Sequence, residues 1–258
     1  MSGPHDIVDF HCRLVRRPGA TATLLRTMDA NRIARAAVSP GGLIDLDQLA
    51  TQIVDGGRSE VRADNDWLLR ACGASGGRLL PFFLADPYTD VETYLSMAAQ
   101  FHGLELSPAV HGFSLDEPTV AALIETARAA RHPVYVVCLG RAGTRTSDLA
   151  NLARAYPDVA FVLGHCGFTG LDARALTQIA AVDNVAVETS GCYTAIVGLA
   201  LSRLGPDRVL FGSEYPLQHP AVELAKLASL SLSGAVWEKV AWRNACRLLG
   251  EEIPCPPV

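Results

Sequence analysis

Four side chains that can bind a metal or move a proton each follow a short apolar run in this sequence. They are His11, Cys138, His165 and Glu214, and they offer imidazole nitrogen, thiolate sulfur and carboxylate oxygen. All three donor types bind zinc, and an imidazole or a carboxylate can also accept a proton during catalysis. The sequence therefore predicts one chemical site assembled from the ends of four separate segments.

The runs before these residues have the length and composition of buried strands in a parallel sheet. Eight such runs alternate with segments of helical periodicity, which predicts an α/β fold, a single (β/α)8 TIM-type barrel. A length of 258 residues suits this fold, for which roughly 250 residues are typical. Active sites of such barrels lie at the carboxyl ends of the strands. The predicted strands are residues 7–10, 34–38, 79–84, 104–106, 134–137, 160–163, 185–188 and 209–211.

The longest gap between predicted strands runs from residue 41 to residue 78 and contains Gly, Asp and Arg beside an apolar stretch. We expect a helix and a loop that cover the barrel mouth. The whole chain, residues 1–258, is then a single barrel domain with a lid or insertion around residues 41–78.

The composition excludes several classes of protein. A formal net charge of −5 without a basic cluster argues against nucleic acid as a partner. No apolar segment approaches the roughly 20 residues of a membrane span, and the first residues lack the basic and apolar regions of a signal peptide. None of the seven cysteines forms a C-x-x-C pair. We expect a reduced, cytoplasmic enzyme that acts on a small molecule.

Five short motifs occur in order along the chain. They are Asp9–Arg13 as D-x-H-x-H, Pro133–Gly140 as P-V-x-x-H-x-G, Gly164–Gly167 as G-H-x-G, Gly212–Pro216 as G-S-D-x-P, and Asn244–Leu248 as N-A-x-x-L. With these motifs the chain resembles the amidohydrolase superfamily, in the branch that contains aminocarboxymuconate-semialdehyde decarboxylase. The resemblance covers nearly the whole chain and implies the same barrel, often assembled as a homodimer.

The resemblance also implies a metal site. In the family, histidines of the first, fifth and sixth strands and an aspartate after the eighth surround a divalent metal, whose bound water attacks the substrate. His11 and His165 match this pattern, whereas Arg13, Cys138 and Glu214 stand where members have His, His and Asp.

Two interpretations of these departures remain. The favoured one retains the metal, with His11, Glu105, Cys138, His165 and Glu214 as ligands and zinc as the ion, because a thiolate is a soft donor. In the other interpretation, the permanent charge of Arg13 replaces the metal and binds a substrate carboxylate. His165 and Glu214 would then transfer protons without a metal.

The expected function is amidohydrolase-type hydrolysis of a C–N, ester or lactone bond in a small, anionic molecule by activated water. Glu214 and His165 are the expected catalytic residues, and Arg13, His111 and Arg141 are expected to bind the substrate. Three alternatives stay open: a non-hydrolytic decarboxylase, a metal-independent hydrolase and a catalytically silent binding barrel.

Overall fold

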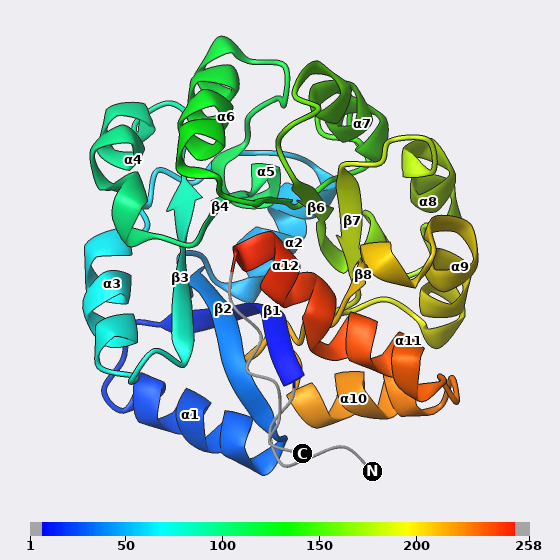
Figure 1. Cartoon of the computed structure of the whole chain (residues 1–258). Helices are drawn as coiled ribbons and strands as arrows, with labels where there is room; N and C mark the ends of the chain where they lie inside the picture. Colours follow the sequence, from blue (N-terminus) through cyan, green and yellow to red (C-terminus); the bar gives the residue numbers. More distant parts are fainter. Residues whose placement is uncertain (1–6, 251–258) are drawn as a thin grey trace.

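All eight predicted apolar runs form strands of one parallel sheet in the computed structural model, which describes residues 7–250. The strands follow one another around the sheet in chain order, and helices surround them (Figure 1). This arrangement confirms the predicted (β/α)8 barrel. The strands are β1 (Ile7–Val15), β2 (Ile33–Gly41), β3 (Leu79–Ala85), β4 (Gly103–Leu106), β5 (Val134–Val136), β6 (Phe161–Leu163), β7 (Val185–Glu188) and β8 (Val209–Leu210).

Backbone hydrogen bonds join β1 to the segment after β8 and so close the barrel. The amide of Phe10 donates to the carbonyl of Phe211 at 2.9 Å, and the carbonyl of His11 accepts from the amides of Ser213 and Glu214 at 3.2 and 2.9 Å. Closure therefore places the residues that follow β8 directly beside the middle of β1.

Helices cover the outside of the barrel and one of its ends. In Figure 1, α12 lies across the centre of the barrel, and its Ala245 and Cys246 pack with Val8 and Phe10 inside it. This packing closes the amino-terminal end, so access to the interior is left to the carboxyl end. The helices are α1 (Ala20–Ala30), α2 (Leu46–Val54), α3 (Asn65–Gly73), α4 (Val91–Met97), α5 (Pro108–His111), α6 (Pro118–Ala130), α7 (Thr146–Ala155), α8 (Ala173–Ile179), α9 (Thr194–Leu204), α10 (Pro220–Ala228), α11 (Gly234–Glu238) and α12 (Asn244–Leu249).

β1 is longer than predicted and contains a bulge. Asp9 pairs with Ala36 and Cys12 with Val38, so three steps on β1 oppose two steps on β2. Side chains alternate between the two faces of a strand, and one extra residue reverses this alternation. Val8 and Phe10 accordingly pack inside the barrel, whereas Cys12 and Leu14 belong to the outer core. The bulge thereby turns both His11 and Arg13 toward the interior.

Residues 41–78 form two helices, α2 and α3, instead of the single helix expected. α3 packs against β2 and β3, and α2 packs against α5. The side-chain amide of Gln52 on α2 donates to the carbonyls of Ala109 and Val110 at 2.9 Å. Among the helices of residues 7–250, none has the length and apolar character required to cross a membrane.

Candidate active site

Glu214 lies at the centre of a polar group at the carboxyl end of the barrel. Its Oε2 is 2.5 Å from Nε2 of His11 and 3.9 Å from Nε2 of His165. Its Oε1 accepts a hydrogen bond from Nε of Arg13 at 2.8 Å. Strand ends that are remote in the sequence thus meet at one carboxylate.

Arg13 bridges two carboxylates. Its Nη2 donates to Oε1 of Glu105 at 2.8 Å, while its Nε holds Glu214. Burial alone would raise the pKa of both carboxyl groups, but the guanidinium and His11 outweigh burial and hold the pKa of Glu214 well below its usual range. The same two groups lower the pKa of Glu105. Both glutamates are therefore ionised, and the charge of Arg13 is largely committed to them.

His11 is held by Tyr135 on one face of its ring and by Glu105 and Glu214 at its two nitrogens. It stacks on Tyr135 with ring centroids 4.0 Å apart, and its Nδ1 is 3.9 Å from Oε2 of Glu105. Burial opposes protonation of His11, but Glu214 and Glu105 together raise its pKa. His11 therefore has a fixed orientation in which Nε2 faces Glu214.

Asp9 fixes the bulge of β1 to the segment after β8. Its carboxyl group accepts from the amide and the hydroxyl of Ser213, at 2.9 and 2.5 Å, and from the amide of His11 at 3.2 Å. Burial raises the pKa of Asp9 to about 7. We assign Asp9 to positioning the site, because its oxygens are used within the backbone around His11.

His165 has a defined tautomer because of a hydrogen-bonded chain behind it. Its Nδ1 is 2.9 Å from Oγ of Ser190, and the Ser190 hydroxyl donates to Oε2 of Glu188 at 2.9 Å. Since the serine hydrogen is used on Glu188, Oγ must accept a hydrogen from Nδ1. Nε2 of His165 then carries a lone pair that is available as a ligand or as a base.

Glu188 at the end of β7 is a site residue for which the sequence analysis proposed no role. It is completely buried and also accepts from the hydroxyl of Tyr135 at 2.9 Å and from the amide of His165 at 3.3 Å. A signal was present, because Glu188 is a carboxylate at the end of an apolar run, like Glu214. No family motif drew attention to it.

Two motif glycines, Gly164 and Gly212, leave space for the hydrogen-bonded side chains of Glu188 and Tyr135. A Cβ atom at Gly212 would overlap the carboxylate of Glu188, and a Cβ atom at Gly164 would lie 2.5 Å from the hydroxyl oxygen of Tyr135. Both positions lack room for any side chain. Gly164 of G-H-x-G and Gly212 of the motif after β8 are therefore explained by packing inside the barrel.

Cys138 does not join the polar group. Tyr135 and Val137 face the interior, so alternation turns Cys138 to the outer core, where Thr146 hydrogen-bonds its thiol. In P-V-x-x-H-x-G the histidine stands four residues after the proline, and Val137 occupies that position here. Burial raises the pKa of the Cys138 thiol, which also opposes ligand chemistry.

Neither of the other two expected substrate-binding residues joins the polar group. Arg141 donates from Nη1 to the carbonyls of Gln52 and Ile53 at the end of α2, at 2.9 and 2.8 Å. His111 on α5 is completely buried, burial lowers its pKa, and neither ring nitrogen has a hydrogen-bond partner within the described chain.

His11, His165 and Glu214 form a group whose ligand atoms all lie within 4.8 Å of one another. Nε2 of His11 and Oε2 of Glu214 are buried, and within residues 7–250 neither makes a well-directed hydrogen bond despite their contact. Two histidines and one glutamate are a known ligand set of catalytic zinc sites, which leave a fourth position open. The donor set and this close pair of buried donor atoms fit a divalent ion.

The charges around the group also fit a cation. The buried carboxylates of Glu105 and Glu214 are bridged by the guanidinium of Arg13, and the buried carboxylate of Glu188 lies 3.9 Å from Nδ1 of His165. Two of these carboxylates, those of Glu105 and Glu214, have lowered pKa values and share the single guanidinium of Arg13, so negative charge exceeds positive charge in this trio. Buried charge of this kind requires compensation, either by a divalent ion or by protonated imidazoles.

The group opens into a cavity of about 530 Å³ at the carboxyl end of the barrel. Arg13, His165 and Glu214 form part of its lining, together with residues 40–44 and the inner face of α2. A concave, largely apolar cavity with a few convergent polar groups is typical of a small-molecule site.

A closed (β/α)8 barrel with such a site at its carboxyl end defines an enzyme. The sequence model of the amidohydrolase family matches residues 8–250. The chain therefore belongs to the amidohydrolase family. No curated protein matches the chain.

Solved structures share the fold over nearly the whole chain. The 5-carboxyvanillate decarboxylase of Novosphingobium aromaticivorans, in complex with manganese and a nitrobenzoic acid, has a TM-score of 0.71 at 16% identity, covering 95% of this chain and 96% of that one. The 2,6-dihydroxybenzoate decarboxylase of Rhizobium has a TM-score of 0.68 at 17% identity, covering 95% and 99%. A Pseudomonas putida protein assigned as a 2-pyrone-4,6-dicarboxylic acid hydrolase has a TM-score of 0.71 at 16% identity, covering 95% and 97%. At such identities the likeness concerns the fold.

Proposed function

We propose that this protein is a metal-dependent hydrolase that cleaves a C–N, ester or lactone bond of a small molecule. The observation that carries the proposal is the group of His11, His165 and Glu214, whose ligand atoms lie within 4.8 Å of one another and of which His165 and Glu214 line the cavity. Retention of three ionisable side chains in this geometry argues against a catalytically silent barrel, for which apolar replacements would be less costly.

We assign His11, His165 and Glu214 to holding the ion. Without Cys138 the donors are two nitrogens and one oxygen, so a soft sulfur donor no longer singles out zinc. Zinc suits the set, and manganese, which a similar structure contains, is the ion to compare with it. When bound, the ion would polarise a carbonyl and lower the pKa of water toward neutrality.

The remaining residues have distinct roles. Arg13 holds the carboxylate of Glu214 in place. Its ion pairs with Glu214 and Glu105 use Nε and Nη2, so Nη1 can face a substrate oxygen on which negative charge develops. Glu214 is a weak proton acceptor because Arg13 keeps its pKa low. The Ser190–Glu188 chain fixes the tautomer of His165, as partners of metal-binding histidines commonly do.

The decisive measurement is metal analysis of protein purified without chelator. We expect about one divalent ion per chain, lost in His11→Ala and Glu214→Ala and retained in Cys138→Ala, with circular dichroism to verify folding. A metal-free protein whose turnover collapses in His165→Ala would instead favour metal-independent hydrolysis. A metal-free protein unaffected by all of these changes would favour a silent barrel.

Non-hydrolytic decarboxylation is the second candidate. Two of the similar structures are decarboxylases, which favours testing this reaction beside hydrolysis. Turnover in isotopically labelled water separates the two reactions. Hydrolysis places the label in the product acid, whereas decarboxylation releases carbon dioxide and leaves no labelled acid.

A further inference from the structure

The wall of the active cavity is apolar on almost every side. Leu49 and Ile53, one turn apart on α2, line it together, so one face of this helix covers the site. Ser107, Thr169 and Gln218 are its uncharged polar members. Most other members are apolar, among them Leu43, Ile44, Val110, Val137 and Phe168, and Cys138 also belongs to the lining.

The cations expected to bind an anionic substrate are engaged elsewhere. Arg13 is paired with Glu105 and Glu214, and Arg141 is bound to the carbonyls that end α2. His111 does not line the cavity, and burial keeps it neutral by lowering its pKa. Within the described lining, no lysine or unpaired arginine remains for a substrate carboxylate.

The floor of the cavity does not attract an anion either. The carboxylate of Glu214 lines this floor beside Arg13, and both Nε and Nη2 of Arg13 are already paired with the carboxylates of Glu214 and Glu105. In a low-dielectric site, an additional carboxylate on the substrate would be desolvated without a partner.

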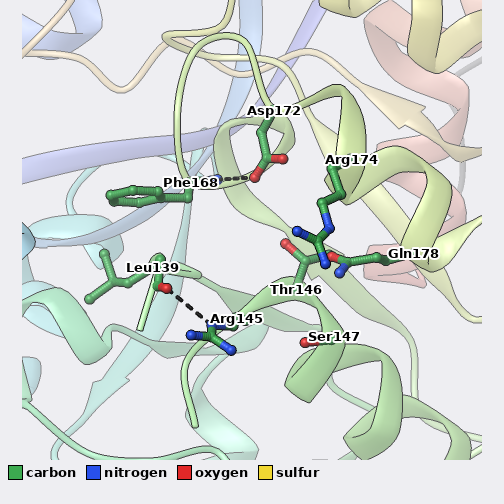
Figure 2. Close-up of a pocket in the computed structure, with 9 residues that line it drawn as sticks. Leu139, Arg145, Thr146, Ser147, Phe168, Asp172, Arg174 and Gln178 are labelled. Carbon is green, nitrogen blue, oxygen red and sulfur yellow. Dashed lines mark hydrogen bonds between the residues drawn. The ribbon is translucent and has the colours of Figure 1, made fainter. Parts of the chain in front are cut away.

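Positive charge lies in a neighbouring cavity of about 350 Å³, beyond an apolar partition. Leu139 and Phe168 belong to both linings, and Figure 2 shows them on one side of the second cavity, with Arg174 on the other. Asp172 accepts from the amide of Phe168 at 3.0 Å and fixes this loop. The charge of Arg145 and Arg174 is therefore separated from the active cavity.

We propose that the active cavity takes an uncharged substrate with an apolar body, such as a neutral amide, ester or lactone. This inference rests on the proposed function, because it names the substrate class for the same site. The reactive carbonyl lies against the polar floor, and the apolar body lies against α2, α5 and Phe168. The anionic substrate expected from the sequence would leave its charge unpaired on this wall.

The test compares two probes that share one scaffold and differ in one carboxylate group. N-benzylacetamide is neutral, and 4-(acetamidomethyl)benzoate has a carboxylate at the far end of the ring. Calorimetry or ligand-observed NMR measures both affinities without any turnover. We expect the neutral probe to bind about tenfold more tightly or better, which corresponds to about 1.4 kcal/mol. Equal affinities, tighter binding of the benzoate, or binding of neither probe overturns the proposal.

Paired variants locate the binding. Ile53→Asp places a carboxylate on the apolar wall and should weaken N-benzylacetamide binding about tenfold. The adjacent Val54 is 73% exposed, so Val54→Asp is the matched control and should leave the affinity unchanged. Ile53→Ala, with a smaller loss, serves if the charged variant does not fold. Equal effects at both positions would contradict the assignment.

Two further results keep the substrate class apart from the catalytic proposal. Benzoate binding that disappears in the Arg145→Ala/Arg174→Ala double variant would show that the second cavity holds an anion, which overturns the uncharged substrate. A preference for the neutral probe in a protein without metal or turnover would support the substrate class, while the hydrolytic proposal fails.

Discussion

Ser190→Ala removes the hydroxyl that joins Glu188 to the ring of His165. Two hydrogen bonds at 2.9 Å are lost, one of them to a buried carboxylate. Nδ1 of His165 then has no acceptor to define the tautomer, and Glu188 keeps Tyr135 and the backbone as donors. The change therefore acts on His165 while the rest of the site stays in place.

The magnitude follows from the lost bonds. A hydrogen bond to a charged group contributes about 1.5–3 kcal/mol, and removing a partner that orients a metal-binding histidine commonly weakens metal affinity about 10–100-fold. The two ranges agree, since each factor of ten is about 1.4 kcal/mol. We expect zinc affinity to fall by about one to two orders of magnitude.

The assay is competition with a chelator of known zinc affinity, together with nitrogen NMR of the histidine rings in metal-free protein. Wild-type His165 should have its hydrogen on Nδ1, and Ser190→Ala should lose this preference. The exposed Ser96, whose hydroxyl bonds only to the carbonyl of Thr93 among the described residues, provides the control Ser96→Ala. Unchanged zinc affinity with an unchanged tautomer would refute the assigned chain.

Two further predictions concern stability. Gly212→Ala places a methyl group against Glu188 and should lower the free energy of unfolding by roughly 1–3 kcal/mol. Gly198→Ala in α9, where the added Cβ atom would make an ordinary contact of 3.7 Å with Leu230, should raise it by roughly 0.5–1 kcal/mol in the same urea titration. An equal loss in both variants would contradict the packing argument. Burial lowers the pKa of His132 to about 4 in the folded protein. The ring therefore stays neutral in the folded state at pH values where the same ring in the unfolded chain, with a pKa of about 6.5, binds a proton. The free energy of unfolding thus falls as the pH falls toward 4, and this ring accounts for about 2 kcal/mol of the loss at pH 5. His132→Gln should reduce the difference between the free energies of unfolding measured in urea at pH 7 and pH 5. An unchanged difference would show that other groups dominate.

The sequence alone determined the barrel and much of its site. Apolar runs of strand length alternate with helical periodicity, and this pattern is local, so all eight strands could be located before any contact was known. His11, His165 and Glu214 were selected because carboxyl ends of parallel strands meet at one edge. These expectations depend on which segment ends where.

The tertiary structure alone decided which side chains face inward and what they contact. A single extra residue in β1 turns His11 and Arg13 to the interior, and the alternation of β5 turns Cys138 away from it. The pairing of Arg13 with Glu105 and Glu214 depends on strands that lie far apart in the sequence. The same is true of the hydrogen bonds that connect Glu188 through Ser190 to His165. A shift of one residue in strand register turns every side chain to the other face of the sheet. The near-continuous apolar run of a buried parallel strand looks the same before and after such a shift. Which side chains make up the site could therefore be known only from the tertiary structure.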